Sequence, residues 1–151
     1  IKNYCKEYKK AFKKNEIYLF SSLGEDESLD EIQPKRIKID QSLVDDPLKI
    51  EDFQNSMVIF DDCDVLGEKK IRDAVYKMLN TILETGRHFS VSCFVVNHLP
   101  TGGKETRRIL NEAHSVVYFP HSGSARQLNY LLMDYLGLDK KDVEKNQTEQ
   151  E

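Results

Sequence analysis

Two adjacent carboxylates, Asp61 and Asp62, come directly after an unbroken apolar run at residues 57–60. A continuous apolar run of this length is typical of a strand that is buried on both faces of a parallel sheet. The carboxylates would then lie at the carboxyl end of that strand, where open α/β sheets place their ligands. One carboxylate can hold the water shell of a Mg²⁺ ion, and the next can polarise an attacking water. The alternative is an acidic turn in which Asp62 or Asp64 caps the following helix.

A second apolar run, residues 91–96, ends in Asn97 and His98. An amide in this place could serve as a sensor of phosphate, because it can donate to a phosphate oxygen and accept from water at once. Asn is equally common in turns before a proline such as Pro100, so both interpretations of Asn97 stay open. For His98, a turn or packing role is favoured over a catalytic base. The spacing of the 4 histidines predicts no zinc site.

Arginines are the third group of residues that could take part in phosphoryl transfer. A guanidinium can stabilise transition-state charge within its own chain or from a neighbouring subunit. Arg87 leads into the second apolar run, and Arg107 and Arg108 follow the loop after it. For each of them a surface ion pair is the simpler interpretation. Residues 102–104, Gly-Gly-Lys, lack the spacing of a phosphate loop and are interpreted as a turn.

Alternating strands and helices must position these side chains. Apolar stripes and short apolar runs predict helices at residues 1–14, 67–85, 106–114 and 122–136, and strands at 17–21, 57–60, 91–96 and 115–119, with a short edge strand at 36–40. Gly86 and Gly137 follow two of the helices as C-caps. The alternation predicts an α/β domain with a mainly parallel sheet between helices over residues 1–138, followed by a polar tail at 139–151.

The composition fits one globular domain. The 151 residues are 39% hydrophobic and 32% charged, and no apolar run of membrane length occurs, so no membrane partner is predicted. The net charge of −4 gives no general affinity for nucleic acid, so DNA would need a local basic patch. The lysines at residues 2–14 are interpreted as a solvated helix face rather than as that patch. The 3 cysteines, without metal-ligand spacing, indicate a reducing compartment.

The Walker A motif, G-x-x-x-x-G-K-S/T, is absent from the sequence. Without its backbone amides and lysine, no strong triphosphate site forms. The helix predicted at residues 1–14 also begins without a Ser, Thr or Asp cap. We therefore expect a phosphate loop upstream of Ile1, and we expect residues 1–151 to be inactive alone.

Four sequence blocks occur in a specific order: Val-Ile-Phe-Asp-Asp at 58–62, which has the form of a Walker B segment, then residues 84–88, 96–98 and 105–114. Together they resemble the P-loop ATPases of large DNA viruses that are similar to poxvirus-type genome-packaging ATPases, within the FtsK–HerA group. The resemblance covers roughly residues 1–140. The order of the blocks is more specific than any single block.

The resemblance implies a three-layer α/β/α, P-loop NTPase-like fold with the sheet order 5-1-4-3-2, in which residues 57–60 form strand 3, residues 91–96 form strand 4 and the P-loop strand is missing. It implies ATP and Mg²⁺ as cofactors and hydrolysis that drives double-stranded DNA into a capsid. It also implies a homo-oligomeric ring and capsid proteins as further partners. The implied location is the host cytoplasm, at a viral factory, or the virion.

By motif, Asp61 would bind Mg²⁺. Asp62 would lie beside it at the nucleotide and would activate the attacking water. Asn97 would be the sensor, and Arg87 is preferred as the arginine finger. The second acid is Asp62 where many relatives in the wider group have Glu, which shortens its reach to water. Two other functions stay open, an ATPase in another DNA transaction such as helicase-like unwinding and a non-catalytic α/β interaction module that lost its nucleotide site. The sequence upstream of Ile1 would discriminate between the enzymes and the module.

Overall fold

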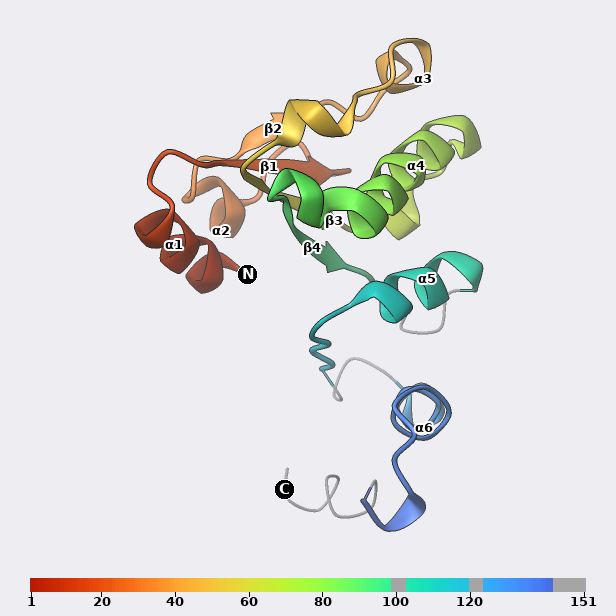
Figure 1. Cartoon of the computed structure of the whole chain (residues 1–151). Helices are drawn as coiled ribbons and strands as arrows, with labels where there is room; N and C mark the ends of the chain where they lie inside the picture. The colour runs from red at the N-terminus through yellow and green to blue at the C-terminus, as the bar shows by residue number, and fades with distance from the viewer. Residues whose placement is uncertain (99–102, 120–123, 143–151) are drawn as a thin grey trace. The chain divides into compact units, whose positions relative to one another are not determined.

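The computed structural model describes residues 1–98, 103–119 and 124–142 (Figure 1). The chain divides into two compact units, Ile1–His98 and Leu99–Glu151, and each is described by itself. The boundary expected between residues 138 and 139 falls inside the second unit.

A 4-stranded parallel sheet forms the centre of the first unit. Its strands are β1 (Glu16–Ser21), β2 (Lys35–Ile37), β3 (Ser56–Asp61) and β4 (Ser92–Val96), in the order β2-β1-β3-β4. Ser21 is the register partner of Asp61, and Asp61 is the register partner of Val96. The central strands therefore end at one common edge. The predicted α/β class, the parallel pairing of the two apolar runs and the short edge strand are confirmed.

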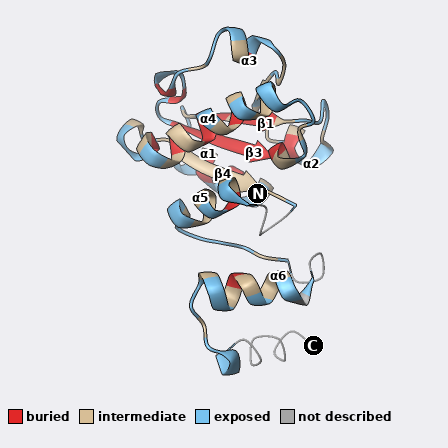
Figure 2. Cartoon of the chain, turned by 90° about the vertical axis from the view of Figure 1, so that its right-hand side faces the viewer, coloured by how far each residue is buried: buried red, intermediate tan, exposed pale blue. Residues whose placement is uncertain are grey.

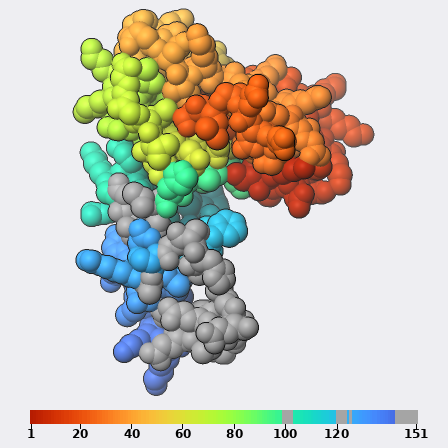
Figure 3. Space-filling model, turned by 180° about the vertical axis from the view of Figure 1, so that it is seen from behind, coloured from red at the N-terminus to blue at the C-terminus, as the bar shows by residue number. Residues whose placement is uncertain are grey.

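Short and long helical segments surround this sheet. They are α1 (Lys2–Ala11), α2 (Glu27–Asp30), α3 (Ser42–Asp45), η1 (Ile50–Phe53), η2 (Cys63–Val65), α4 (Lys69–Thr85) and η3 (Gly86–Phe89). In Figure 1, α1 and α2 lie on one side of the strands and α4 lies on the other. Figure 3 shows α1 in red beside the orange α2 region, and an ion pair of 2.8 Å between Lys6 Nζ and Glu31 Oε1 joins these two segments.

Alternate side chains of β3 face different helical layers. Met57 and Ile59 join a buried cluster with residues of α1 and α2, among them Cys5, Tyr8 and Leu29. The other face of the sheet meets η1. There the Phe53 ring lies 4.9 Å from the Tyr18 ring and 6.0 Å from the Phe20 ring, centroid to centroid. Because successive side chains of a strand point to opposite faces, β3 contributes to the hydrophobic packing on both sides of the sheet.

Helix α4 is the longest helix of the first unit and follows the predicted apolar stripe. Its buried side chains are Val75, Met78, Leu79 and Ile82. It ends at Thr85 as expected, but Gly86 keeps a right-handed backbone (φ −56°) and the chain continues into η3. Space is tight there, since a Cβ would lie 3.3 Å from Ile82 Cγ2 and this side chain would have to shift. Ser90 takes the left-handed conformation instead, with φ 54°.

The second unit is helical in its described part. It contains α5 (Lys104–Glu112) and α6 (Ala125–Asn129), which continues as a π-helix, η5 (Tyr130–Tyr135). Gly137 adopts φ +68°, and the Leu138 N–H donates to the Leu132 carbonyl over 2.9 Å. The predicted glycine C-cap is confirmed there, while residues 120–123 and 143–151 lie outside the described residues.

The predicted third core strand at residues 115–119 is wrong. These residues form no strand and pair with no described strand. The side chains of Val117 and Phe119 are 78% and 71% exposed. An apolar run becomes a strand only when it pairs with another strand, and residues 115–119 pair with none of the described strands.

Candidate functional site

The carboxylate of Asp61 closes β3 at the carboxyl edge of the sheet. The residue is 8% exposed, and the Ser21 hydroxyl at the end of β1 donates to Asp61 Oδ2 over 3.4 Å. Burial raises the pKa of the Asp61 carboxyl, the charge of Asp62 adds to the rise, and the hydrogen bond from Ser21 opposes it. Asp61 is therefore a desolvated carboxylate, which gains more from a cation than an exposed one would.

Asp62 turns the chain away from the sheet. Its N–H still donates to the Val96 carbonyl over 3.2 Å, so the β3–β4 ladder continues one residue beyond β3. Its backbone is left-handed, with φ 52° and ψ 31°, a conformation that Asp tolerates better than most residues. One of its carboxylate oxygens, Oδ1, lies 3.2 Å from His98 Nε2. The turn after β3 and the turn after β4 thus meet through these two side chains.

Asp64 joins the same two turns through its own carboxylate. Its Oδ2 accepts a hydrogen bond of 3.1 Å from the His98 backbone N–H. Its Oδ1 is buried and has no hydrogen-bond partner in the part of the chain that the structure describes. One ligand atom each from Asp62, Asp64 and His98 lie within 4.8 Å of one another.

Sequence reasoning missed this cluster, because it tested the histidines only against each other. The signal lay in combining two observations, the Asp-Asp-Cys-Asp segment after one apolar run and the His98 that follows the next run. Parallel pairing of those runs brings the two segments to one edge.

Asn97 follows β4 directly and is half-buried. Because Asp61 and Val96 are register partners, Asn97 comes out of the sheet at the same edge as Asp61 and Asp62. The structure therefore brings three of the four predicted catalytic and metal-binding residues to one place in the fold.

Arg87 does not join them. It is exposed in η3, where the Phe89 carbonyl accepts a hydrogen bond of 3.0 Å from the N–H of Asn55, the residue before β3. This places Arg87 at the amino edge of the sheet, and the 5 residues of β4 separate the two edges by about 16 Å. Arg87 could therefore reach such a site only in a neighbouring subunit. Arg107 and Arg108 lie on α5 in the second unit.

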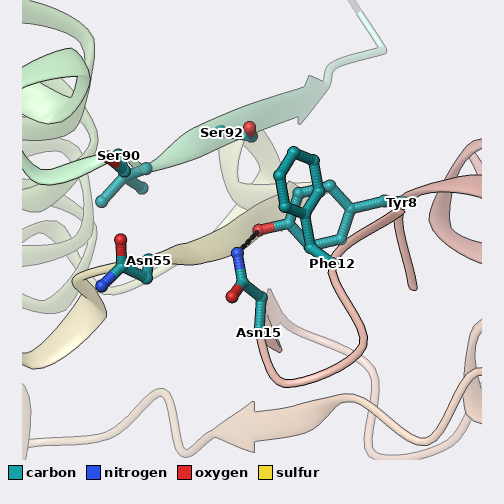
Figure 4. A pocket seen from close by; sticks show the side chains of 7 residues that line it. Tyr8, Phe12, Asn15, Asn55, Ser90 and Ser92 are labelled. Carbon is teal, nitrogen blue, oxygen red and sulfur yellow. Dashed lines mark hydrogen bonds between the residues drawn. The ribbon is translucent and has the colours of Figure 1, made fainter. Parts of the chain in front are cut away.

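A hollow of about 420 Å³ lies at the same amino edge. Figure 4 shows its uncharged lining, in which Asn15 Nδ2 donates to the Tyr8 hydroxyl over 3.0 Å. Residues from α1 and from the starts of β3 and β4 complete the wall: Phe12, Asn55, Ser90, Val91 and Ser92. Without a cationic side chain or a glycine-rich loop, this hollow does not suit a triphosphate.

Comparison with known proteins gives a similarity to a viral protein. The chain is 43% identical over 143 residues to "Uncharacterized protein V3" of Sputnik virophage, an alignment that covers 93% of this chain. The chain spans 58% of the length of that relative. No protein-family profile matches the chain. No solved structure matches it either. The similarity is therefore to a protein of a virophage, and the name of that protein states no activity.

Helix length and hydropathy decide whether a helix can cross a membrane. Among the described residues, no helix combines the length and the apolar character needed to cross a bilayer.

Proposed function

We propose that this chain is part of an ATP-hydrolysing motor that moves double-stranded DNA into a viral capsid. The observation that carries the proposal is the common carboxyl edge of β3 and β4. Asp61 and Asp62 follow one strand there, and Asn97 follows its parallel neighbour. An acidic pair beside an amide suits the hydrolysis of a Mg²⁺-bound triphosphate.

The strand order supports the P-loop NTPase-like interpretation. The resemblance implies that strands 2, 3 and 4 are consecutive neighbours, and β1, β3 and β4 are consecutive neighbours in the sheet. In the implied order, a P-loop strand would pair with the outer edge of β4.

The proposed roles follow from position. Asp61 binds Mg²⁺ through its water shell, because its carboxylate is buried at the carboxyl end of β3. Asp62 orients the attacking water, and Asn97 contacts the γ-phosphate. Arg87, at the far edge, acts as an arginine finger on the next subunit of a homo-oligomeric ring, which matches a motor that surrounds duplex DNA. Capsid proteins are the remaining proposed partners, and the host cytoplasm, at a viral factory, or the virion is the proposed location.

The test is hydrolysis of Mg²⁺-ATP by the full-length protein that contains this chain. Asp62→Asn should keep nucleotide binding and lower turnover by about 10²–10⁴-fold, the usual contribution of general acid–base catalysis. Asp61→Ala should weaken binding of Mg²⁺-ATP itself. The matched control is Asp73→Asn, an exposed carboxylate on α4 that pairs with Lys69. Equal turnover in Asp62→Asn and Asp73→Asn would disprove the assigned role.

DNA translocation is tested separately from hydrolysis. A packaging motor should hydrolyse ATP faster with duplex DNA and should displace a third strand from duplex DNA without separating the duplex. Strand separation would instead favour the helicase-like function. A full-length protein that binds neither ATP nor DNA would favour the non-catalytic interaction module.

A further inference from the structure

The turn after β3 and the turn after β4 present three side chains of metal-ligating type to one point. Asp62 and Asp64 come from the first turn, and His98 comes from the second. This cluster does not include Asp61, the residue to which the Mg²⁺ of the proposed ATPase site is assigned. It shares only Asp62 with that site, and its ion binding can be measured without nucleotide.

The distances suit a shared ion. Asp62 Oδ1 and His98 Nε2 are 3.2 Å apart. Two ligands that each lie about 2.1 Å from one ion have this separation when they subtend an angle of about 100°, which lies between octahedral and tetrahedral geometry. The third ligand atom is within 4.8 Å of the other two. His98 has 58% of its side chain exposed, so its ring can move the short distance that closes the set.

One carboxylate oxygen of Asp64 accepts a hydrogen bond, and the other has no hydrogen-bond partner among the described residues. Oδ2 accepts from the His98 N–H, whereas Oδ1 is buried with no hydrogen-bond partner among the described residues. A buried carboxylate oxygen without a partner costs on the order of 1–3 kcal/mol, and more when it is charged. A cation that reaches Oδ1 would remove that cost. The hydrogen bond to Oδ2 meanwhile fixes the orientation of the carboxylate, as outer contacts do around protein metal sites.

The donor set decides which ions fit best. Two carboxylates suit Mg²⁺, Ca²⁺ and Mn²⁺, whereas an imidazole suits Zn²⁺, Fe²⁺ and other transition metals. We infer that Asp62, Asp64 and His98 form a binding site for a transition-metal dication of the Zn²⁺ or Mn²⁺ type, with water at the remaining positions. The site ties the turn after β3 to the turn after β4 and binds its ion without nucleotide.

The experiment uses the full-length protein after treatment with chelator and in the absence of nucleotide. Zn²⁺ titration calorimetry should give one site per chain that Mg²⁺ at the same concentration does not fill. Asp64→Asn and His98→Gln should each weaken Zn²⁺ binding at least tenfold. His88→Gln is the matched control, because His88 is also exposed but lies in η3 at the opposite edge of the sheet. Equal affinity in His98→Gln, Asp64→Asn and His88→Gln would overturn the inference.

A second measurement needs no variant. Mn²⁺ added in small amounts should broaden the NMR signals of the His98 ring well before those of the His88 ring, because paramagnetic relaxation falls steeply with distance. Simultaneous broadening of both rings would show weak surface binding only and would overturn the inference. Neither measurement involves ATP. A protein that binds Zn²⁺ but does not hydrolyse ATP would therefore refute the proposed function alone.

Discussion

Strands β3 and β4 are neighbours with similarly apolar sequences, yet they are buried to different extents. Every residue of β3 is buried, whereas every residue of β4 is half-buried (Figure 2). Both strands have helices near their ends, and both pair in parallel. The difference lies in their edges. β3 pairs with β1 and β4, but β4 pairs only with β3 among the described strands.

The outer edge of β4 can be assigned to particular backbone groups. The Val96 carbonyl accepts a hydrogen bond from the Asp62 N–H, so Val96 points its backbone groups toward β3. In a parallel strand the direction alternates from one residue to the next, and the groups of Cys93 and Val95 therefore point outward. An apolar run therefore predicts that a strand can be buried, and the strands that pair with it determine how far it is buried.

The largest predicted effect comes from truncating one aromatic ring in each strand. Phe60 is fully buried and stacks on Phe20 with ring centroids 4.7 Å apart. Phe60→Ala should lower the free energy of unfolding by about 3–5 kcal/mol, much of the total of a typical domain. Phe94 in β4 is half-buried against Tyr4, so Phe94→Ala should cost about 1–2 kcal/mol. Urea unfolding measures both, and equal losses would refute the contrast between the strands.

The next prediction concerns association through the outer edge of β4. Unpaired strand edges recruit other strands, so the 151-residue chain should form larger species as its concentration rises. Val95→Pro should reduce this association, because proline removes an outward N–H and is tolerated on edge strands. Light scattering and sedimentation velocity report the effect. Val95→Thr, which keeps the outward N–H, is a control that should leave association unchanged. Monomeric behaviour of the unaltered chain at all concentrations would contradict the prediction.

A smaller effect is expected at the end of β3. Folding raises the pKa of Asp61, so the fold favours its protonated form. The stabilising contribution is present below the ordinary carboxyl pKa of about 3.9 and is lost as the pH rises through the folded value. Asp61→Asn should therefore raise the melting temperature at neutral pH, and the gain should shrink toward acid pH. Asp73→Asn should change the melting temperature little at any pH, since its ion pair with Lys69 is exposed. If Asp61→Asn melted at a lower temperature than the unaltered protein at neutral pH, the prediction would be wrong.

The smallest effect leaves stability untouched and concerns two thiols. Burial raises the pKa of Cys63, after β3, and of Cys93, in β4, to about 12. At pH 8 only about one thiol in 10⁴ is then ionised, so alkylation should be slow in the native protein. Cys93 should nevertheless react before Cys63, because an edge strand opens locally at lower free energy than a central one. Mass spectrometry of the alkylated peptides gives the order, and faster modification of Cys63 would contradict it.

The central strands and the long helix could be predicted because their signals are local. The apolar run at residues 57–60 and the stripe that contains Val75 and Leu79 each identify one element without reference to any other. The run at residues 115–119 has the same local signal, but a strand also needs a distant partner, and no local pattern reports one. Strand prediction failed there for that reason.

The candidate site shows the same limit. Asp61, Asp62 and Asn97 were found because each follows an apolar run. The approach of His98 to Asp62 depends on the left-handed turn at Asp62 and on the register of β3 with β4, neither of which is visible in residue spacing. Arg87 could not be assigned to an edge of the sheet until the order and direction of the strands were known.

The strand order β2-β1-β3-β4 contains a reversal in the direction of winding. The chain moves outward from β1 to β2, returns past β1 to β3, and then continues to β4. Since parallel crossovers are right-handed, the two directions carry the connecting segments over opposite faces, α2 over one and α4 over the other. The segments that leave β1 and β3 therefore diverge at the carboxyl edge, and such a topological switch point opens a crevice.

Ser21 and Asp61 end the two strands that flank this switch point. A ligand that approaches Asp61 would enter between the diverging segments, beside a hydroxyl that already donates to the carboxylate. It would exchange one hydrogen bond of Asp61 for another interaction and would leave the packing of Phe20 against Phe60 intact. The winding of the chain thus places this buried carboxylate at the point where the two connecting segments separate.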